Sequence, residues 1–387
     1  MYNVLTLNKI AACGTDLFDR SKYNVGDNVS EPAAIMVRSA KMHDMAFEKS
    51  LLAIGRAGAG VNNIPVDKCA ADGIVVFNTP GANANAVKEL VLTALLISSR
   101  RVPDALVWAQ DLKGNGDDVA GIVEKGKAQF AGPEISGKTL GNIGLGAIGV
   151  LVANAAISLG MKVVGYDPFL SVNTALRLSS KVKTVSDVKD VYTEADYVTI
   201  HVPYNAQTKG TIKAETIALM KDGARVINLA RGELVDNTAM IEALENGKIA
   251  AYVTDFPCEE ILGVKNAIAL PHLGASTPEA EDNCAVMAAE ELIDYLENGN
   301  IRNSVNYPNA SMSASGTKVC VLHKNVPAVI SEVTSILGSE KINIENMVNA
   351  SRKEYAYTLI DASGEITDKI RKELEEVDNV IRIRVIK

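Results

Sequence analysis

The chain has 387 residues, of which 47% are hydrophobic and 22% charged, and its formal net charge is −8. This length exceeds the roughly 100 to 200 residues of one domain, so two or three domains are expected, and the composition argues against extended disorder. The negative charge disfavours a nucleic-acid or anionic-membrane binder, so an anionic ligand requires a local cluster of basic residues.

The N-terminal segment lacks a basic stretch followed by a sustained apolar run, and apolar stretches such as LVLTALLI are too short to span a membrane. Five cysteines are scattered along the chain without CxxC spacing. This pattern favours reduced thiols in a cytoplasmic protein and gives no indication of a metal site.

Residues 1 to about 85 alternate the apolar runs YNVLTL, AAIMVRS, LLAIGRAG and IVVFNTP with helical stretches, which predicts a small α/β unit. Two of these runs end in arginine, at Arg38 and Arg56. Ligands of open α/β sheets lie beyond the carboxyl ends of the strands, so both arginines are placed to bind an anion. The alternative is that each is a solvated surface residue.

A helical pattern from about 88 to 110 has more apolar surface than one helix face needs, so we expect it to cross between domains or to lie in a subunit contact. From Gly137 to Pro271 the order strand, helix, strand repeats. Its strands, VVGY, YVTIHV, RVINLA, AYVTDF and AIALP, are continuously apolar. Such strands are typical of a parallel sheet covered on both faces, which predicts a second α/β domain.

A polar linker rich in serine and asparagine follows at 306–317. Residues 318–387 then have the order strand, helix, strand, strand, helix, strand, which is that of a ferredoxin-like domain. Its small size suits a ligand-sensing module.

Between a predicted strand and a predicted helix, the sequence GLGAIG has glycines at positions 144, 146 and 149 of a GxGxxG motif. In this context Gly144 permits a tight turn, Gly146 lets the backbone approach a pyrophosphate, and Gly149 lets the helix pack closely on the strand. Ala147 and Ile148 begin the helix, whose free N–H groups favour an anion. A glycine-rich turn that binds nothing is the alternative.

The next strand ends at Asp167, 18 residues after Gly149. A carboxylate there accepts hydrogen bonds from a ribose and repels a 2′-phosphate, so the motif favours NAD over NADP. Asn142 is a polar residue inside the first strand, which indicates an edge strand or a paired amide.

Three later strands of the same domain run into Arg231, into the cluster TDFPCEE at 254–260, and into His272. Strand ends of this fold share one rim, so a guanidinium, a carboxylate and an imidazole can meet beside a nicotinamide. Histidine has an unperturbed pKa of about 6.5 and can accept the proton of an alcohol, while arginine can bind a carboxylate through two hydrogen bonds. This predicts oxidation of a 2-hydroxy acid. His201 is a weaker alternative for the base. Arg231 could instead form an ion pair with Glu233 or Asp236, and His272 could instead cap the helix that begins near Ser276 or Pro278.

The segments NLARGELVD, LPHLGAST and GKTLGNIGLGAIG, with RAGAGVNNI and VFNTPGANANAVKEL upstream, resemble the D-isomer-specific 2-hydroxyacid dehydrogenases. The resemblance runs from about residue 33 to the C-terminus. It implies that Arg231 binds the substrate carboxylate, that His272 is the acid/base, and that Glu259 is the partner of His272.

At this last position the chain departs from the family, which usually has D-V-F-x-x-E-P where this sequence has T-D-F-P-C-E-E. One alignment places Thr254 at the strand-end position that faces the cofactor, and the other places Asp255 there, which we favour. Both alignments give Glu259 as the partner of the histidine and leave Glu260 as a fallback.

The resemblance also implies a discontinuous substrate-binding domain of residues 1–87 and 273–305, an NAD-binding domain of residues 88–272, and an ACT-like domain of residues 318–387, with substrate in the cleft between the first two. Further cofactor contacts are implied at His201, Val202, Pro203, Thr208, Ala230 and Gly274. Substrate contacts are implied at Arg38, Ser39, Arg56, Gly58 and Asn83, with Lys41 and Lys127 as weaker candidates that could equally be solvated.

Within the family, Arg38 and a C-terminal ACT domain favour 3-phosphoglycerate as the substrate, at the first step of L-serine synthesis. The alternatives are lactate, glyoxylate or hydroxypyruvate, and, from another class, a non-catalytic NADH-sensing corepressor. In ACT domains the pattern that matches His323, Asn325 and Asn343 binds a small amino acid such as L-serine between two subunits, which implies a homodimer or homotetramer. Ala328 stands where a glycine is usual, and ACT domains can also serve only for assembly.

Overall fold

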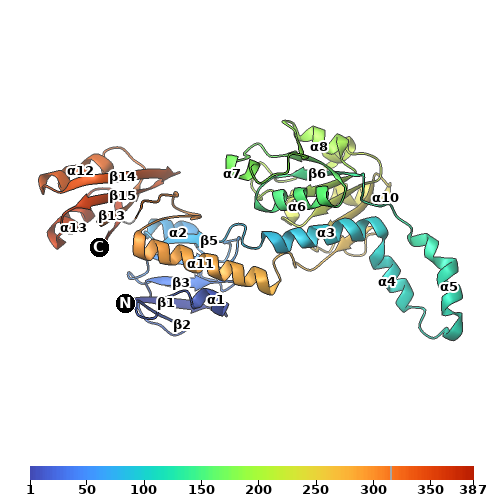
Figure 1. Ribbon diagram of the computed structural model, residues 1–387, viewed down its shortest axis with the longest axis horizontal. Coiled ribbons are helices and arrows are strands. Elements are labelled where there is room, and N and C mark those ends of the chain that lie inside the picture. Colours follow the sequence, from blue (N-terminus) through green and yellow to red (C-terminus); the bar gives the residue numbers. More distant parts are fainter. Residues whose placement is uncertain (314–315) are drawn as a thin grey trace. The chain divides into compact units, whose positions relative to one another are not determined.

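The computed structural model describes residues 1–313 and 316–387, which form two compact units (Figure 1). The first unit is Met1–Asn83 with Pro278–Lys387, and the second is Ala84–Thr277. The chain therefore leaves the first unit and returns to it. The three-domain division with boundaries after residues 87 and 272 stays a prediction, and residues 314 and 315 of the predicted linker 306–317 lie outside the described residues.

The first unit contains a five-stranded parallel sheet of order β2-β1-β3-β4-β5. Its strands are β1 (Tyr2–Leu7), β2 (Tyr23–Gly26), β3 (Ala34–Val37), β4 (Ala53–Arg56) and β5 (Val75–Asn78). Its helices are α1 (Ala12–Thr15), α2 (Val66–Ala71) and α11 (Pro278–Asn298). The sequence predicted four of the strands and missed β2, which has only four residues.

Alternate residues of β3 face opposite sides of this sheet, as the two-residue period of a strand requires. Ala34 and Met36 belong to the core that contains α11, whereas Ile35 and Val37 belong to a second core on the other face. Both faces are thus covered, which explains why the strand is apolar throughout.

The second unit contains a seven-stranded parallel sheet of order β12-β11-β10-β9-β6-β7-β8. Its strands are β6 (Thr139–Ile143), β7 (Lys162–Tyr166), β8 (Lys183–Thr184), β9 (Tyr197–Ile200), β10 (Ala224–Asn228), β11 (Ile249–Thr254) and β12 (Ala267–Ala269). The strand order reverses between β6 and β9. Ligands of doubly wound sheets bind at the carboxyl ends of the strands at this point.

Helices cover this sheet and extend from it (Figure 1). They are α3 (Ala84–Arg100), α4 (Val102–Gln110), α5 (Val119–Gly126), α6 (Ala147–Ser158), α7 (Val172–Ala175), α8 (Val188–Glu194), α9 (Ala214–Leu219) and α10 (Asn237–Glu245), with 3₁₀ turns η1 (Gly116–Asp118), η2 (Lys127–Phe130) and η3 (Gly232–Leu234). The pattern predicted as one helix over about 88–110 is two helices. Arg101 has a left-handed φ of 46° between them, and Pro103, which cannot continue a hydrogen-bonded helix, lies in the first turn of α4.

The C-terminal region forms an antiparallel sheet of order β14-β15-β13-β16. Its elements are β13 (Thr317–Lys324), α12 (Val329–Ser339), β14 (Asn343–Arg352), β15 (Tyr355–Ser363), α13 (Asp368–Glu375) and β16 (Val380–Ile386). This βαββαβ order is the predicted ferredoxin-like arrangement. One face packs against α12 and α13, whereas Cys320, Leu322, Tyr357 and Leu359 on the other face join the core of the five-stranded sheet.

The sheet face toward α11 also binds the C-terminal end of that helix. Arg384 donates from Nη1 to the Tyr295 carbonyl oxygen (3.1 Å) and from Nη2 to that of Leu296 (3.0 Å). The Tyr357 hydroxyl donates to the Gly299 carbonyl oxygen at 2.6 Å. The last carbonyls of a helix lack partners within it, so these side chains cap α11.

Candidate active site

The glycine-rich turn joins β6 to α6, and its three glycines have different surroundings. Gly144 has a φ of 93°, and a Cβ there would lie 2.7 Å from the His201 carbonyl oxygen. A Cβ on Gly149 would lie 1.9 Å from the Gly144 carbonyl oxygen, so only glycine lets the helix approach the turn. A Cβ on Gly146 would meet no atom within 4 Å, so the space beside this residue is open.

Asn142 explains how the turn is held. It is fully buried in β6, which lies between β9 and β7, and its Nδ2 donates to the Gly149 carbonyl oxygen at 2.7 Å. Of the two predicted explanations, the paired amide is therefore confirmed and the edge strand is wrong. The amide ties the strand before the turn to the helix after it.

Asp167 follows β7 and lies beside the same turn. Its Oδ2 accepts a hydrogen bond from the Leu145 amide, and its Oδ1 accepts one from the Phe169 amide, both at 2.8 Å. A carboxylate has about four acceptor sites, so two backbone bonds orient it and leave capacity for a ribose hydroxyl. The first turn of α6 has no side-chain cap, and its N–H groups can bind a pyrophosphate beside the open space at Gly146. These residues fit NAD.

The loop after β9 lies next to this turn. Burial lowers the pKa of His201 to about 3, and its Nε2 lies 3.0 Å from the Thr199 hydroxyl, so the ring is neutral and a poor base near neutral pH. The Thr208 hydroxyl donates to the Pro203 carbonyl oxygen at 2.6 Å and fixes the loop that contains Val202.

At the same edge of the sheet, β10 leads to Arg231. Asn228 Nδ2 donates to the Arg231 carbonyl oxygen at 2.8 Å, and Asn228 Oδ1 accepts from the Ala230 amide at 3.2 Å. The backbone is thereby fixed, while the Arg231 side chain remains exposed and able to bind an anion.

Asp255 follows β11 and is fully buried, and its carboxylate lies beside the Gly274 amide. Burial raises its pKa, and the nearby His272, the Gly274 amide and Arg231 act in the opposite direction. An ideal Cβ on Gly274 would lie 3.4 Å from Asp255 Oδ2. β10, β11 and β12 are neighbouring strands, so Arg231, Asp255 and His272 follow adjacent strand ends. That the three side chains act together stays a prediction.

His272 and Glu259, which the sequence predicts to be partners, are both exposed. His272 is exposed, with its ring centroid 4.9 Å from that of Phe256. Glu259 and Glu260 are exposed in the turn after β11, and among the residues that the structure describes no hydrogen bond or ion pair joins either to His272. The Glu259–His272 pair stays a prediction. Burial and then the Glu260 carboxylate raise the pKa of the Cys258 thiol, which places Glu260 beside that thiol.

The first unit has its own cluster at the carboxyl ends of β3 and β4. Val37 is paired with Arg56, so Arg38 and Arg56 lie on neighbouring strand ends. A Cβ on Gly58 would lie 2.1 Å from Arg56 Nη1, so the guanidinium packs against this glycine, whose φ is 151°. Asn8 Oδ1 accepts hydrogen bonds from the Ser39 amide (3.1 Å) and the next amide (2.7 Å).

The remaining predicted substrate residues have less distinctive surroundings. Asn83 is half-buried and Lys41 is exposed. Lys127 forms an exposed ion pair with Glu124, with Nζ and Oε2 2.5 Å apart. Nothing in these surroundings distinguishes the two lysines from solvated residues.

Comparison with known proteins defines the family. Residues 92–274 match the family described as D-isomer specific 2-hydroxyacid dehydrogenase, NAD binding domain. The chain is 33% identical over 355 residues to D-3-phosphoglycerate dehydrogenase of Escherichia coli, a match that covers 88% of this chain and 82% of that protein. The chain belongs to the D-isomer-specific 2-hydroxyacid dehydrogenase family.

Other members of this dehydrogenase family are longer or are similar in fold. D-3-phosphoglycerate dehydrogenase of Synechocystis is 37% identical over 327 residues, which cover 80% of this chain. The matched part is only 56% of that relative, so the chain spans little more than half of its length. The NAD⁺-bound 3-phosphoglycerate dehydrogenase of Entamoeba histolytica has a TM-score of 0.60 at 24% identity, over 79% of this chain and 98% of that one.

Three residues of the C-terminal sheet are predicted to bind an amino acid. His323 is buried, with Nδ1 2.8 Å from the Lys324 carbonyl oxygen and Nε2 2.9 Å from the Thr358 hydroxyl. Asn325 lies just beyond it, but Asn343 begins β14 at the opposite end of the sheet, because these strands are antiparallel. Residue 351 of β14 is level with His323, because both are paired with Ala356 of β15. At about 3.3 Å per residue, the eight residues from 343 to 351 place Asn343 about 26 Å from the level of His323.

Ala328 precedes α12 with a left-handed φ of 75°, a conformation that favours glycine. Glycine is usual at the corresponding position of ACT domains. The alanine therefore carries backbone strain, which costs of order 1 kcal/mol.

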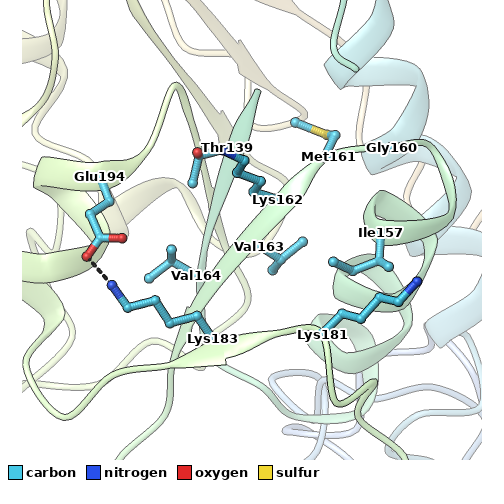
Figure 2. Close-up of a pocket in the computed structure, with 10 residues that line it drawn as sticks. All are labelled: Thr139, Ile157, Gly160, Met161, Lys162, Val163, Val164, Lys181, Lys183 and Glu194. Atoms are coloured by element: carbon cyan, nitrogen blue, oxygen red, sulfur yellow. Dashed lines mark hydrogen bonds and ion pairs between the residues drawn. The ribbon is translucent and has the colours of Figure 1, made fainter. Parts of the chain in front are cut away.

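A surface pocket of about 450 Å³ lies away from these residues (Figure 2). Its lining includes Thr139 and Lys162, the first residues of β6 and β7, whereas the glycine-rich turn follows the last residue of β6. The pocket is thus at the opposite edge of the sheet from the cofactor residues. Within it, Lys183 Nζ lies 2.6 Å from Glu194 Oε1 (Figure 2).

Two kinds of feature are absent from residues 1–313 and 316–387. No helix in them is long and apolar enough to cross a membrane. No group of three or more His, Cys, Asp or Glu side chains in them could hold a metal ion.

Proposed function

We propose that the chain catalyses the NAD-dependent oxidation of D-3-phosphoglycerate to 3-phosphohydroxypyruvate, the first step of L-serine synthesis. The observation that carries this proposal is the pair of arginines on the neighbouring ends of β3 and β4, in a chain whose curated relatives are named D-3-phosphoglycerate dehydrogenase. A substrate with a carboxylate and a phosphate needs cationic partners for both groups. The overall charge of −8 makes such local cations distinctive.

In this proposal the glycine-rich turn and Asp167 would hold NAD, which would supply the hydride acceptor for C2 of the substrate. Arg231 binds the substrate carboxylate, for which its exposed guanidinium offers two parallel N–H donors. His272 accepts the proton of the 2-hydroxyl group, so the alkoxide character that develops as the hydride leaves is neutralised. Arg38 and Ser39 bind the phosphate, with Arg56 and Asn83 also on the substrate side.

A carboxylate that favours the imidazolium form of His272 completes the proton transfer. Glu259 is the partner implied by the family pattern. Asp255 is favoured by its position, because it is buried at the end of β11, and β11 lies between the strands that lead to Arg231 and His272. We therefore propose that Asp255 shares or takes over this role, in addition to its predicted contact with the cofactor.

Regulation by L-serine and assembly into a homodimer or homotetramer are part of the proposal. An amino-acid site made of His323, Asn325 and Asn343 requires a second copy of the edge strand β14, since one chain holds these residues at opposite ends of its sheet. A subunit contact through α4 is supported by Leu106 and Val107, which are 59% and 66% exposed on a helix that buries no residue. A cytoplasmic location is supported by the five free cysteines.

The test compares NADH formation from D-3-phosphoglycerate and from D-lactate. We expect turnover of the phosphorylated substrate, and an Arg38→Met variant with a raised KM for it. A preference for D-lactate would refute the substrate. NADH binding without turnover of any 2-hydroxy acid would indicate a nucleotide-sensing corepressor instead.

A further inference from the structure

The cluster that we assign to phosphate binding contains a second, oppositely charged residue. Arg38 Nη2 lies 2.6 Å from Oε1 of Glu281, and both side chains are 42% exposed. Sequence reasoning did not select Glu281, because it is 243 residues away from Arg38 in the chain. The short distance is typical of a charge-assisted hydrogen bond, so part of the arginine's donor set is already in use.

Glu281 is held in place by the helix that carries it. It lies in the first turn of α11, where a negative charge interacts favourably with the helix dipole. A Cβ on Gly14 of α1 would lie 2.6 Å from the Ala285 backbone, and one on Gly55 of β4 would lie 2.9 Å from Leu292. With such close packing on two sides, α11 cannot move its first turn away from Arg38 without disturbing the core.

We infer that Glu281 is an internal competitor for the anion that Arg38 binds. This inference rests on the proposed function. A ligand must displace or share the Glu281 carboxylate to reach the guanidinium. Breaking the Arg38–Glu281 ion pair subtracts the same interaction from the binding of every anion, whether monoanionic or dianionic. Glu281 thus weakens the binding of anions at Arg38.

The first test is the Glu281→Gln variant, which removes the charge and keeps the size of the side chain. We expect its KM for D-3-phosphoglycerate to fall by about two- to fivefold, the range for a partly exposed ion pair, with a smaller change in kcat. Inhibition by inorganic phosphate should strengthen by a similar factor, and both effects should shrink as salt screens the charges. An unchanged or raised KM would overturn the inference, because a residue that only orients Arg38 would weaken binding when it is altered.

Glu279→Gln is the matched control, because Glu279 is an exposed residue of the same helical turn and forms no ion pair within the described ranges. It makes the same change in net charge, so we expect its KM to equal that of the wild type. An equal fall in KM in both variants would refute a local role for Glu281.

The double variant with Arg38→Met separates the two proposals. If Glu281 acts through Arg38, the effect of Glu281→Gln should disappear in that background, and its persistence would overturn the inference. If the wild type does not turn over D-3-phosphoglycerate at all, the proposed function itself fails. If Arg38→Met raises KM while Glu281→Gln changes nothing, only the inference about Glu281 fails.

Discussion

Alanine substitution at Gly149 and at Gly146 should separate two properties of the glycine-rich turn. At Gly149 a methyl group would lie 1.9 Å from the Gly144 carbonyl oxygen, and no rotamer change can relieve a clash with backbone. Overpacking costs about 1 to 3 kcal/mol, and alanine returns about 1 kcal/mol of helix propensity. With the upper value of the overpacking cost, the free energy of unfolding falls by about 2 kcal/mol. This lowers the Tm of a unit of this size by roughly 4 to 8 °C.

Gly146→Ala should behave differently, because its methyl group meets no atom within 4 Å and its φ of −72° is accessible to alanine. The ligand-free protein should unfold at the wild-type temperature. The methyl group lies in the space that fits the pyrophosphate, so NADH binding should weaken roughly 10- to 150-fold, which corresponds to the loss of one charge-assisted hydrogen bond.

The assays are thermal unfolding without ligand and titration with NADH followed by fluorescence. Gly149→Ala should impair both, and Gly146→Ala only the second. A Gly149→Ala protein that unfolds at the wild-type temperature would refute the packing argument. Wild-type NADH affinity in Gly146→Ala would show that the pyrophosphate does not occupy this space.

Three other predictions concern ionisable residues. His272→Ala should lower turnover by roughly 10²- to 10⁴-fold with NADH binding retained, and normal turnover would remove His272 from the mechanism. Asp255→Asn should move the acidic limb of the kcat/KM profile to lower pH; a shift seen only in Glu259→Gln would return the partner role to Glu259. Burial raises the pKa of Glu291 to about 8, so the folded state binds a proton that the unfolded state releases above about pH 4.5, and stability falls as pH rises between these values. Glu291→Gln, which keeps an acceptor for Asn303, should therefore raise Tm at pH 8 but not near pH 4.5, whereas an equal change at both would contradict the assignment.

Local sequence patterns predicted most of the helices and strands. The partners of individual side chains depend on residues brought together by the fold, and the patterns did not predict them. The glycine spacing and the apolar strands identified the second domain, because each depends on residues close together in sequence. The partner of Asn142 is a carbonyl group across a turn, and only the coordinates identify it. The burial of Asp255 was missed for a similar reason, since counting residues along TDFPCEE does not reveal which of its carboxylates is buried.

The capping of α11 by the C-terminal sheet has a consequence for truncation. A chain that ended near residue 316 would lose Arg384 and Tyr357. The carbonyl groups at the end of α11 and at Gly299 would then lack these donors, and part of the core of the five-stranded sheet would be exposed. Shortened forms of this protein should therefore be poorly folded in the first unit rather than active and freed from regulation. The C-terminal module is a structural part of the unit to which it is attached, and it cannot be exchanged for another without redesign of the surface beneath it.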